Sequence, residues 1–232
     1  MTQPWLESPA RLAQHPVMLR ALPALLSLAA APAAACDTAL ILAMDVSNSV
    51  DVAEYRLQAD GLAAAFRDEE ITELMVDGEV AVMVIQWSGD DKQAVTIPWT
   101  QVRTAADVTR LSVEAAAMPR AFVLSDTAPA EAILFALRQF EDAPDCTARV
   151  IDVSGDGTPN GGSEVRNASR LAERAGVTIN GIAIESMGLA ITNFYARALI
   201  TRDGFVMTAR MHRDYADTLR RKIIRELSQV LG

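Results

Sequence analysis

The sequence predicts an α/β protein with a doubly wound, mostly parallel sheet and one short antiparallel edge strand. Segments of strand length that are almost entirely apolar alternate with segments whose apolar residues recur at helical spacing. Uninterrupted apolar strands suit a parallel sheet that helices cover on both faces, and the alternation requires right-handed crossover connections. Half of the residues are apolar, so the chain of 232 residues can bury a sizeable core in one domain.

The first half of the chain supplies the beginning of this pattern. The first apolar run ends in Asp45, and Asp51 after it is a candidate N-cap for the following helix. Pro98 marks the third predicted strand as an edge strand, because proline cannot donate a ladder hydrogen bond. The predicted elements are strands at 39–44, 80–87 and 94–99 and helices at 51–67, 104–118 and 128–140.

The second half repeats the alternation. Gly176 is predicted to end a helix in the left-handed conformation. The final helix has apolar residues on one stripe, which predicts that this face packs on the sheet. The predicted elements are strands at 149–154, 177–184 and 204–208 and helices at 163–175 and 214–231.

The N-terminal segment reads as a secretory signal peptide covering residues 1–35. Residues 21–35 carry no charge and end in small residues, and Arg11 and Arg20 precede them. The apolar run is too short for a comfortable membrane span. We also expect no transmembrane span in the mature chain, 36–232. Met18 is a candidate true start, and a buried N-terminal helix is the alternative reading. We expect an exported protein, periplasmic or secreted.

The charge balance excludes one class of partner. The formal net charge is −9 and the sequence pI is about 4.8. Binding to a phosphate backbone needs a basic patch, so we expect no nucleic-acid partner. An acidic surface is compatible with cation binding without demonstrating it.

Oxygen-bearing side chains follow two predicted strands and open one predicted helix. Asp45, Ser47 and Ser49 come directly after the first strand, Asp156 follows the strand at 149–154, and Thr127 precedes the helix at 128–140. Ligands of open α/β sheets bind beyond the carboxyl ends of the strands, so these side chains are expected to converge. Carboxylates and hydroxyls are the ligands of a hard cation, Mg²⁺ first, with Mn²⁺ or Ca²⁺ also suited. Ser125 and Asp126 compete with Thr127 for its role.

These residues resemble the metal-ion-dependent adhesion site (MIDAS) of the von Willebrand factor A (vWA) family. Asp45-Val46-Ser47-Asn48-Ser49 matches the family's Asp-x-Ser-x-Ser signature, and the resemblance covers about 36–232. It looks closest to a secreted bacterial branch of the family. Gly155 departs from the pattern, because the family usually has threonine before the later aspartate. The resemblance implies a Rossmann-like vWA fold and the metal ligands Asp45, Ser47, Ser49, Thr127 and Asp156.

By the same resemblance, the chain is expected to be a cation-dependent protein-binding module of the cell envelope. A partner protein would present an Asp or Glu to the metal. We expect no enzyme and no catalytic residue. The alternative is a Mg²⁺-dependent phosphatase-like hydrolase, since haloacid dehalogenase-like enzymes also begin with an aspartate after the first strand. Those enzymes have a second aspartate where this chain has Ser47.

The fold that the resemblance implies also suggests a disulfide. Cys36 lies nine residues before Asp45 and Cys146 ten before Asp156, so both cysteines are expected at the opposite end of two neighbouring strands. Lipid modification of Cys36 is the less favoured alternative. Two further residues stay open: Asp152 is either a buried acceptor near the site or satisfied by neighbouring backbone, and His212 is expected to cap a helix or lie on the surface.

Overall fold

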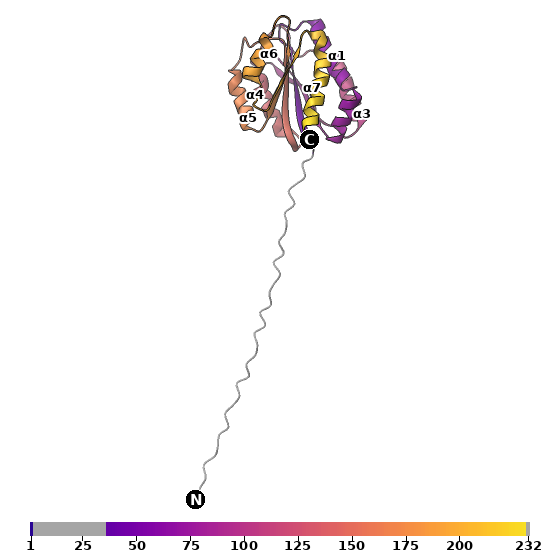
Figure 1. Ribbon diagram of the computed structural model, residues 1–232, viewed down its shortest axis with the longest axis vertical. Coiled ribbons are helices and arrows are strands. Elements are labelled where there is room, and N and C mark those ends of the chain that lie inside the picture. The colour runs from indigo at the N-terminus through magenta and orange to yellow at the C-terminus, as the bar shows by residue number, and fades with distance from the viewer. Residues whose placement is uncertain (2–35, 231–232) are drawn as a thin grey trace. The chain divides into compact units, whose positions relative to one another are not determined.

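A computed structural model describes Met1 and residues 36–230, and Figure 1 shows the arrangement of their elements. The strands are β1 (Cys36–Asp45), β2 (Ala81–Trp87), β3 (Gln93–Gln101), β4 (Cys146–Gly155), β5 (Thr178–Ile184) and β6 (Val206–Ala209). The helices are α1 (Val52–Ala65), α2 (Glu69–Asp77), α3 (Ala105–Ala117), α4 (Pro129–Gln139), α5 (Val165–Arg174), α6 (Ala190–Phe194) and α7 (Tyr215–Val230). Short helical turns cover Phe140–Asp142, Tyr195–Leu199 and His212–Asp214.

The strands form one six-stranded sheet in the order β3-β2-β1-β4-β5-β6. Every neighbouring pair is parallel except β2 and β3, which pair antiparallel at one edge. The predicted fold class is therefore confirmed, including the edge strand that carries Pro98. From the central pair β1 and β4, the chain adds strands outward in opposite directions, β2 and β3 beside β1 and β5 and β6 beside β4. The residues that follow β1 and β4 therefore lie at the crevice where such sheets bind ligands.

Helices cover both faces of the sheet. In Figure 1, α1, α3 and α7 lie on one side and α4, α5 and α6 on the other. Side chains of β1 alternate between the two cores: Leu40 and Leu42 pack in the core of the α1 and α7 side, whereas Ile41 and Ala43 pack with α4 and α5. Because both faces are buried, residues 39–44 of β1 form a continuous apolar run that ends at Asp45.

Local signals account for several element ends. Asp51 caps α1 by accepting from the Glu54 N–H at 2.8 Å, and the Glu54 side chain accepts from the Asp51 N–H at 2.8 Å. Gly176, just past α5, has φ +69°, the left-handed value predicted for it. α2 and α6 were not predicted. Each of them buries few side chains, and those of α2 are Ile71 and Met75.

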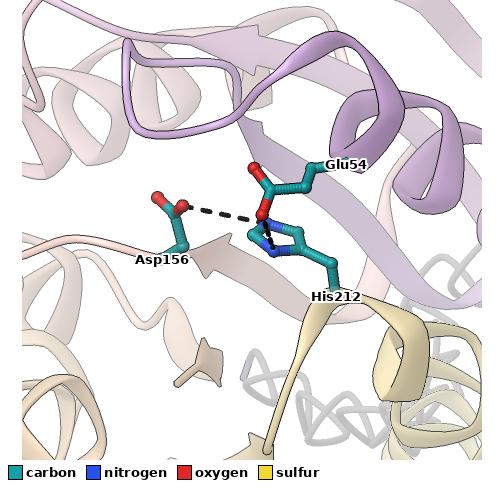
Figure 2. A group of neighbouring side chains, drawn as sticks. All are labelled: Glu54, Asp156 and His212. Atoms are coloured by element: carbon teal, nitrogen blue, oxygen red, sulfur yellow. Dashed lines mark ion pairs between the residues drawn. The ribbon is translucent and has the colours of Figure 1, made fainter. Parts of the chain in front are cut away.

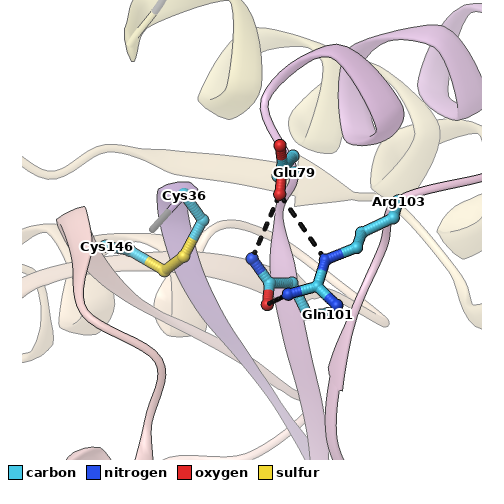
Figure 3. The surroundings of a disulfide bond; sticks show 5 residues. All are labelled: Cys36, Glu79, Gln101, Arg103 and Cys146. Atoms are coloured by element: carbon cyan, nitrogen blue, oxygen red, sulfur yellow. Dashed lines mark hydrogen bonds and ion pairs between the residues drawn. A yellow bond between two sulfur atoms is a disulfide. The ribbon is translucent and has the colours of Figure 1, made fainter. Parts of the chain in front are cut away.

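The predicted disulfide between Cys36 and Cys146 is present (Figure 3). The two residues are register partners at the start of β1 and β4, and their Cα atoms lie 4.5 Å apart. At the same end of the sheet, Arg103 forms an ion pair with Glu79 at 3.6 Å. The bond uses the Cys36 thiol that the lipidation alternative would require.

The predicted signal peptide, residues 1–35 with Met18, lies outside the described residues. Within 36–230, no helix combines the length and the apolar character that a membrane crossing demands.

Candidate metal centre

The loop after β1 turns Asp45 and Ser47 toward one another. Asp45 is fully buried, and its Oδ1 accepts a hydrogen bond of 2.7 Å from the Ser47 N–H. Its Oδ2 is buried and has no hydrogen-bond partner. A buried carboxylate oxygen without a donor is costly, and a bound cation would supply the missing partner.

The five side chains that the sequence singled out lie in one chain of contacts. Thr127 Oγ1 donates to Ser47 Oγ at 3.0 Å, Ser47 Oγ and Ser49 Oγ are 3.2 Å apart, and Ser49 Oγ donates to Asp156 Oδ1 at 2.5 Å. Asp45 joins through the Ser47 amide described above. Three stretches of sequence thus meet at the carboxyl ends of β1 and β4, and the contact to Thr127 favours it over Ser125 and Asp126.

The two carboxylates are held in an unfavourable environment for negative charge. Burial raises the pKa of Asp45 to about 7, with the hydrogen bond from Ser47 opposing the shift and the charge of Asp156 adding to it. Burial also raises the pKa of Asp156, although its hydrogen bond from Ser49 opposes this. A divalent cation would offset both effects, and the set of two carboxylates and three hydroxyls suits a hard ion such as Mg²⁺.

Two residues that the sequence did not single out hold this loop system in place. Arg120 donates from Nη2 to the carbonyl oxygens of Val46 and Ser47, both at 2.9 Å. Asn160 Oδ1 accepts from the Thr127 N–H at 2.7 Å, and the Asn160 N–H donates back to the Thr127 carbonyl at 3.1 Å. Neither residue has a local pattern that reveals its role, because each acts on backbone far away in sequence.

His212 lies beside Asp156, one of these five side chains, and beside Glu54 (Figure 2). Its Nδ1 is 3.1 Å from Glu54 Oε1, and its Nε2 is 3.8 Å from Asp156 Oδ2. The imidazole is only 10% exposed, so the expectation of a surface role is wrong for this residue.

Asp152 also has a partner that neither of its two expected roles included. Its Oδ2 lies 2.6 Å from the Nζ of Lys222 on α7, and both side chains are buried. Lys222 is also paired with Glu226, which accepts a hydrogen bond from Asn180 at 2.7 Å. This buried network ties α7 to the central strands and lies apart from the contacts of the candidate metal ligands.

The rim around the site offers space and apolar surface. An open hollow of about 750 Å³ is lined by Ser49 and Thr127 together with the loop after β2. Leu124 also lines this hollow and is 84% exposed.

A family profile described as "Protein of unknown function (DUF1194)" matches residues 35–231, which is most of the 232-residue chain. The chain belongs to the DUF1194 family. No curated protein matches the DUF1194 chain.

The solved structures similar to the DUF1194 chain include vWA domains. Proximal thread matrix protein 1 from the mussel byssus matches with a TM-score of 0.62 and 18% identity over 83% of this chain and 48% of that one. The DUF1194 chain thus spans about half the length of that relative. Another structure of the byssus protein, with the same TM-score and identity over 84% and 48% of the two chains, is described as having a zinc-occupied MIDAS motif.

A bacterial pilus protein gives a similar match. The vWF domain of the type V pili tip protein Mfa5 from Porphyromonas gingivalis has a TM-score of 0.62 and 9% identity, with 86% of this chain and 98% of that chain covered. At these identities the likeness shows the fold alone. The predicted vWA fold of the DUF1194 chain is therefore confirmed.

Proposed function

We propose that the chain is a divalent-cation-dependent protein-binding module. Asp45, Ser47, Ser49, Thr127 and Asp156 hold a Mg²⁺-class ion, with Mn²⁺ or Ca²⁺ as alternatives. The observation that carries this proposal is the convergence of five oxygen-bearing side chains from three distant stretches, beside a buried Asp45 Oδ2 that has no other partner. Two carboxylates balance the charge of one divalent cation.

The donor set also suggests how the ion would be used. Only two of the five donors are anionic, so a bound ion keeps electrophilic character toward a further carboxylate. Ser49 is exposed and the hollow beside it is open to solvent, which leaves an approach for a partner. The partner would be a protein that presents an Asp or Glu to the ion and an apolar side chain to Leu124 on the rim.

An exported, envelope-associated protein fits these features. The Cys36–Cys146 bond requires an oxidising compartment to form and persist. Residues 1–35 carry the signal-like composition described above. Two structural neighbours, from a pilus tip and from the byssus, are extracellular assemblies, and we extend that setting to this chain as part of the proposal.

Calorimetric titration with Mg²⁺ tests the cation. We expect the oxidised 36–232 chain to bind one Mg²⁺ and to melt at a higher temperature when it does, and the Asp45→Asn variant to do neither. Asp60→Asn is the matched control, because Asp60 is an exposed carboxylate on α1 that forms an ion pair with Arg56. Saturable Mg²⁺ binding that Asp45→Asn leaves intact would refute the proposed site.

Partner capture tests the binding role. Immobilised chain is incubated with proteins of the cell envelope in Mg²⁺ or in chelator, and retained proteins are identified by mass spectrometry. The proposal requires retention that depends on Mg²⁺, is lost in Asp45→Asn and survives in Asp60→Asn. Retention that is equal in chelator would show that the cation has no part in binding.

A phosphatase assay addresses the hydrolase alternative. A hydrolase of that class needs an acid/base carboxylate two residues after Asp45, and Ser47 occupies the position, buried and bonded to Thr127 and Ser49. We expect no turnover of a generic phosphate ester in Mg²⁺. Robust turnover that Asp45→Asn abolishes would favour the hydrolase over the binding module.

A further inference from the structure

Three potential metal ligands gather at the edge of the predicted Mg²⁺ site, and only Asp156 among them also belongs to that site. Glu54 comes from the first turn of α1, Asp156 from the loop after β4, and His212 from the turn before α7 (Figure 2). One ligand atom from each lies within 4.8 Å of the other two. Segments more than 50 residues apart in the sequence therefore meet at this point.

The imidazole of His212 is the second observation that points to a ligand. The His212 side chain is only 10% exposed, and its Nε2 is buried without a hydrogen-bond partner. Asp156 Oδ2 lies 3.8 Å from Nε2, too far for a hydrogen bond. A buried ring nitrogen normally has a hydrogen-bond partner, and an ion bound by Nε2 and the Asp156 carboxylate would supply the missing one.

Asp156 is placed to serve both sites. Its Oδ1 accepts from Ser49 on the side of the predicted Mg²⁺ ligands, whereas its Oδ2 faces His212. Glu54 is similarly divided: its Oε2 accepts from the Asp51 N–H in the capping box, and its Oε1 faces His212 Nδ1. Each carboxylate thus has one oxygen bonded to the protein and one facing His212, but they face different ring nitrogens, so an ion bound at Nε2 takes Glu54 as a ligand when Oε1 turns from Nδ1 toward it.

The mixture of donors indicates the class of metal. One imidazole and two carboxylates are typical of Zn²⁺, which takes nitrogen and oxygen ligands at about 2.0–2.2 Å and is content with four ligands, the fourth being water. Mg²⁺ prefers oxygen alone, so it would favour the neighbouring set. Glu54 is 33% exposed, which leaves solvent access for the water.

We propose that Glu54, Asp156 and His212 form a second metal site, selective for Zn²⁺-class ions, that shares the Asp156 carboxylate with the predicted Mg²⁺ site. The second site does not depend on a partner protein and does not require the first site to be filled. Its occupation would connect the starts of α1 and of α7 to the loop after β4. A purely structural role for His212, a hydrogen bond to Glu54 alone, is the competing explanation.

Zn²⁺ titration in saturating Mg²⁺ separates these explanations. The oxidised 36–232 chain is loaded with Mg²⁺ and titrated calorimetrically with Zn²⁺, and we expect one Zn²⁺ to bind per chain. His212→Gln is expected to weaken this binding more than about 10-fold while Mg²⁺ affinity is unchanged. Glu54→Gln should also weaken it, and the glutamine oxygen can still complete the capping box. Co²⁺ in place of Zn²⁺ adds a visible absorption band that reports nitrogen coordination and should disappear in His212→Gln.

The Asp45→Asn variant distinguishes the two sites. It should lose Mg²⁺ binding and keep the Zn²⁺ site, so failure of the proposed function and failure of this proposal give different results. Asp156→Asn should lose both ions, because its carboxylate is shared. The proposal is overturned if the Mg²⁺-loaded chain binds no Zn²⁺, if His212→Gln and Glu54→Gln both bind it normally, or if Asp45→Asn abolishes Zn²⁺ binding. Retained Mg²⁺ binding in the His212 and Glu54 variants verifies that they fold.

Discussion

Replacing Asp45 with asparagine is expected to stabilise the metal-free protein at pH 8 while abolishing its stabilisation by Mg²⁺. The pKa of Asp45 is raised from 3.8 to about 7, first by burial and then by the charge of Asp156, against the hydrogen bond from Ser47. An acid with a higher pKa in the folded state binds protons preferentially when folded. Stability therefore falls as the pH rises from about 4 to about 7. The difference between the two pKa values corresponds to a loss of about 4 kcal/mol of stability above pH 7.

Asparagine removes the charge and keeps the shape. Its amide oxygen can still accept from the Ser47 N–H, but its NH₂ group takes the place of Oδ2, which has no partner, at a cost of about 1–3 kcal/mol. We expect the variant to be more stable than the wild type by roughly 1–3 kcal/mol at pH 8 in chelator. At pH 5 the wild-type carboxyl is mostly protonated, so the advantage should shrink by about 2–3 kcal/mol.

Urea unfolding at pH 5 and pH 8, in chelator and in Mg²⁺, measures these differences. Burial also raises the pKa of Glu226 to about 7, but that residue contributes the same pH dependence to both proteins and cancels in the comparison. Mg²⁺ should stabilise the wild type alone and reverse the order of stability. The reasoning is wrong if, in chelator, the variant is the less stable protein at pH 8 and its stability changes with pH as the wild type's does.

Three further predictions concern the surroundings of the site. Reducing the Cys36–Cys146 bond, whose partners are 110 residues apart, should lower the free energy of unfolding by about 5 kcal/mol in the chain-entropy model; identical urea midpoints with and without reductant would contradict this. Arg120→Ala removes the hydrogen bonds that hold the loop after β1, so it should weaken Mg²⁺ binding in calorimetry about 10-fold. Arg110→Ala, on the exposed side of α3, should leave Mg²⁺ affinity unchanged. Equal affinities in the two variants would rule out the role of Arg120 in supporting this loop. Gly155→Ala would place a carbon 2.9 Å from Asp45 Oδ2 and 2.7 Å from the Tyr195 hydroxyl, so it should cost about 1–3 kcal/mol of stability and weaken Mg²⁺ binding. Gly157→Ala, with its nearest contact at 3.4 Å, should do neither, and melting plus titration of both variants checks the contrast.

Most of the sheet could be predicted from the sequence because its physical cause is local. β1 and β2 are buried on both faces, so they are apolar runs, and Pro98 identifies the edge. The helix α2 was missed because its nine residues begin with consecutive acidic residues and bury little, which looks like a solvated loop. α6 was missed because it is only five residues long and continues into another helical turn at Tyr195.

The same distinction holds for the candidate site. Asp45, Ser47, Ser49 and Asp156 could be chosen because each follows a recognisable strand. Arg120, Asn160 and His212 could not, since their functions consist of contacts with segments that are distant in sequence. Asp152 was recognised as unusual in an apolar strand, but its partner Lys222 lies 70 residues further on, and no periodicity links the two.

The covalent link between β1 and β4 acts on the same two strands whose far ends carry Asp45 and Asp156. A slip of one strand by a single residue would turn alternate side chains to the opposite face and separate the two aspartates. With Cys36 joined to its register partner Cys146, such a slip would break a bond or strain the chain. Oxidation thus fixes the register of the two strands, so that Asp45 at the end of β1 and Asp156 just after the end of β4 stay close together.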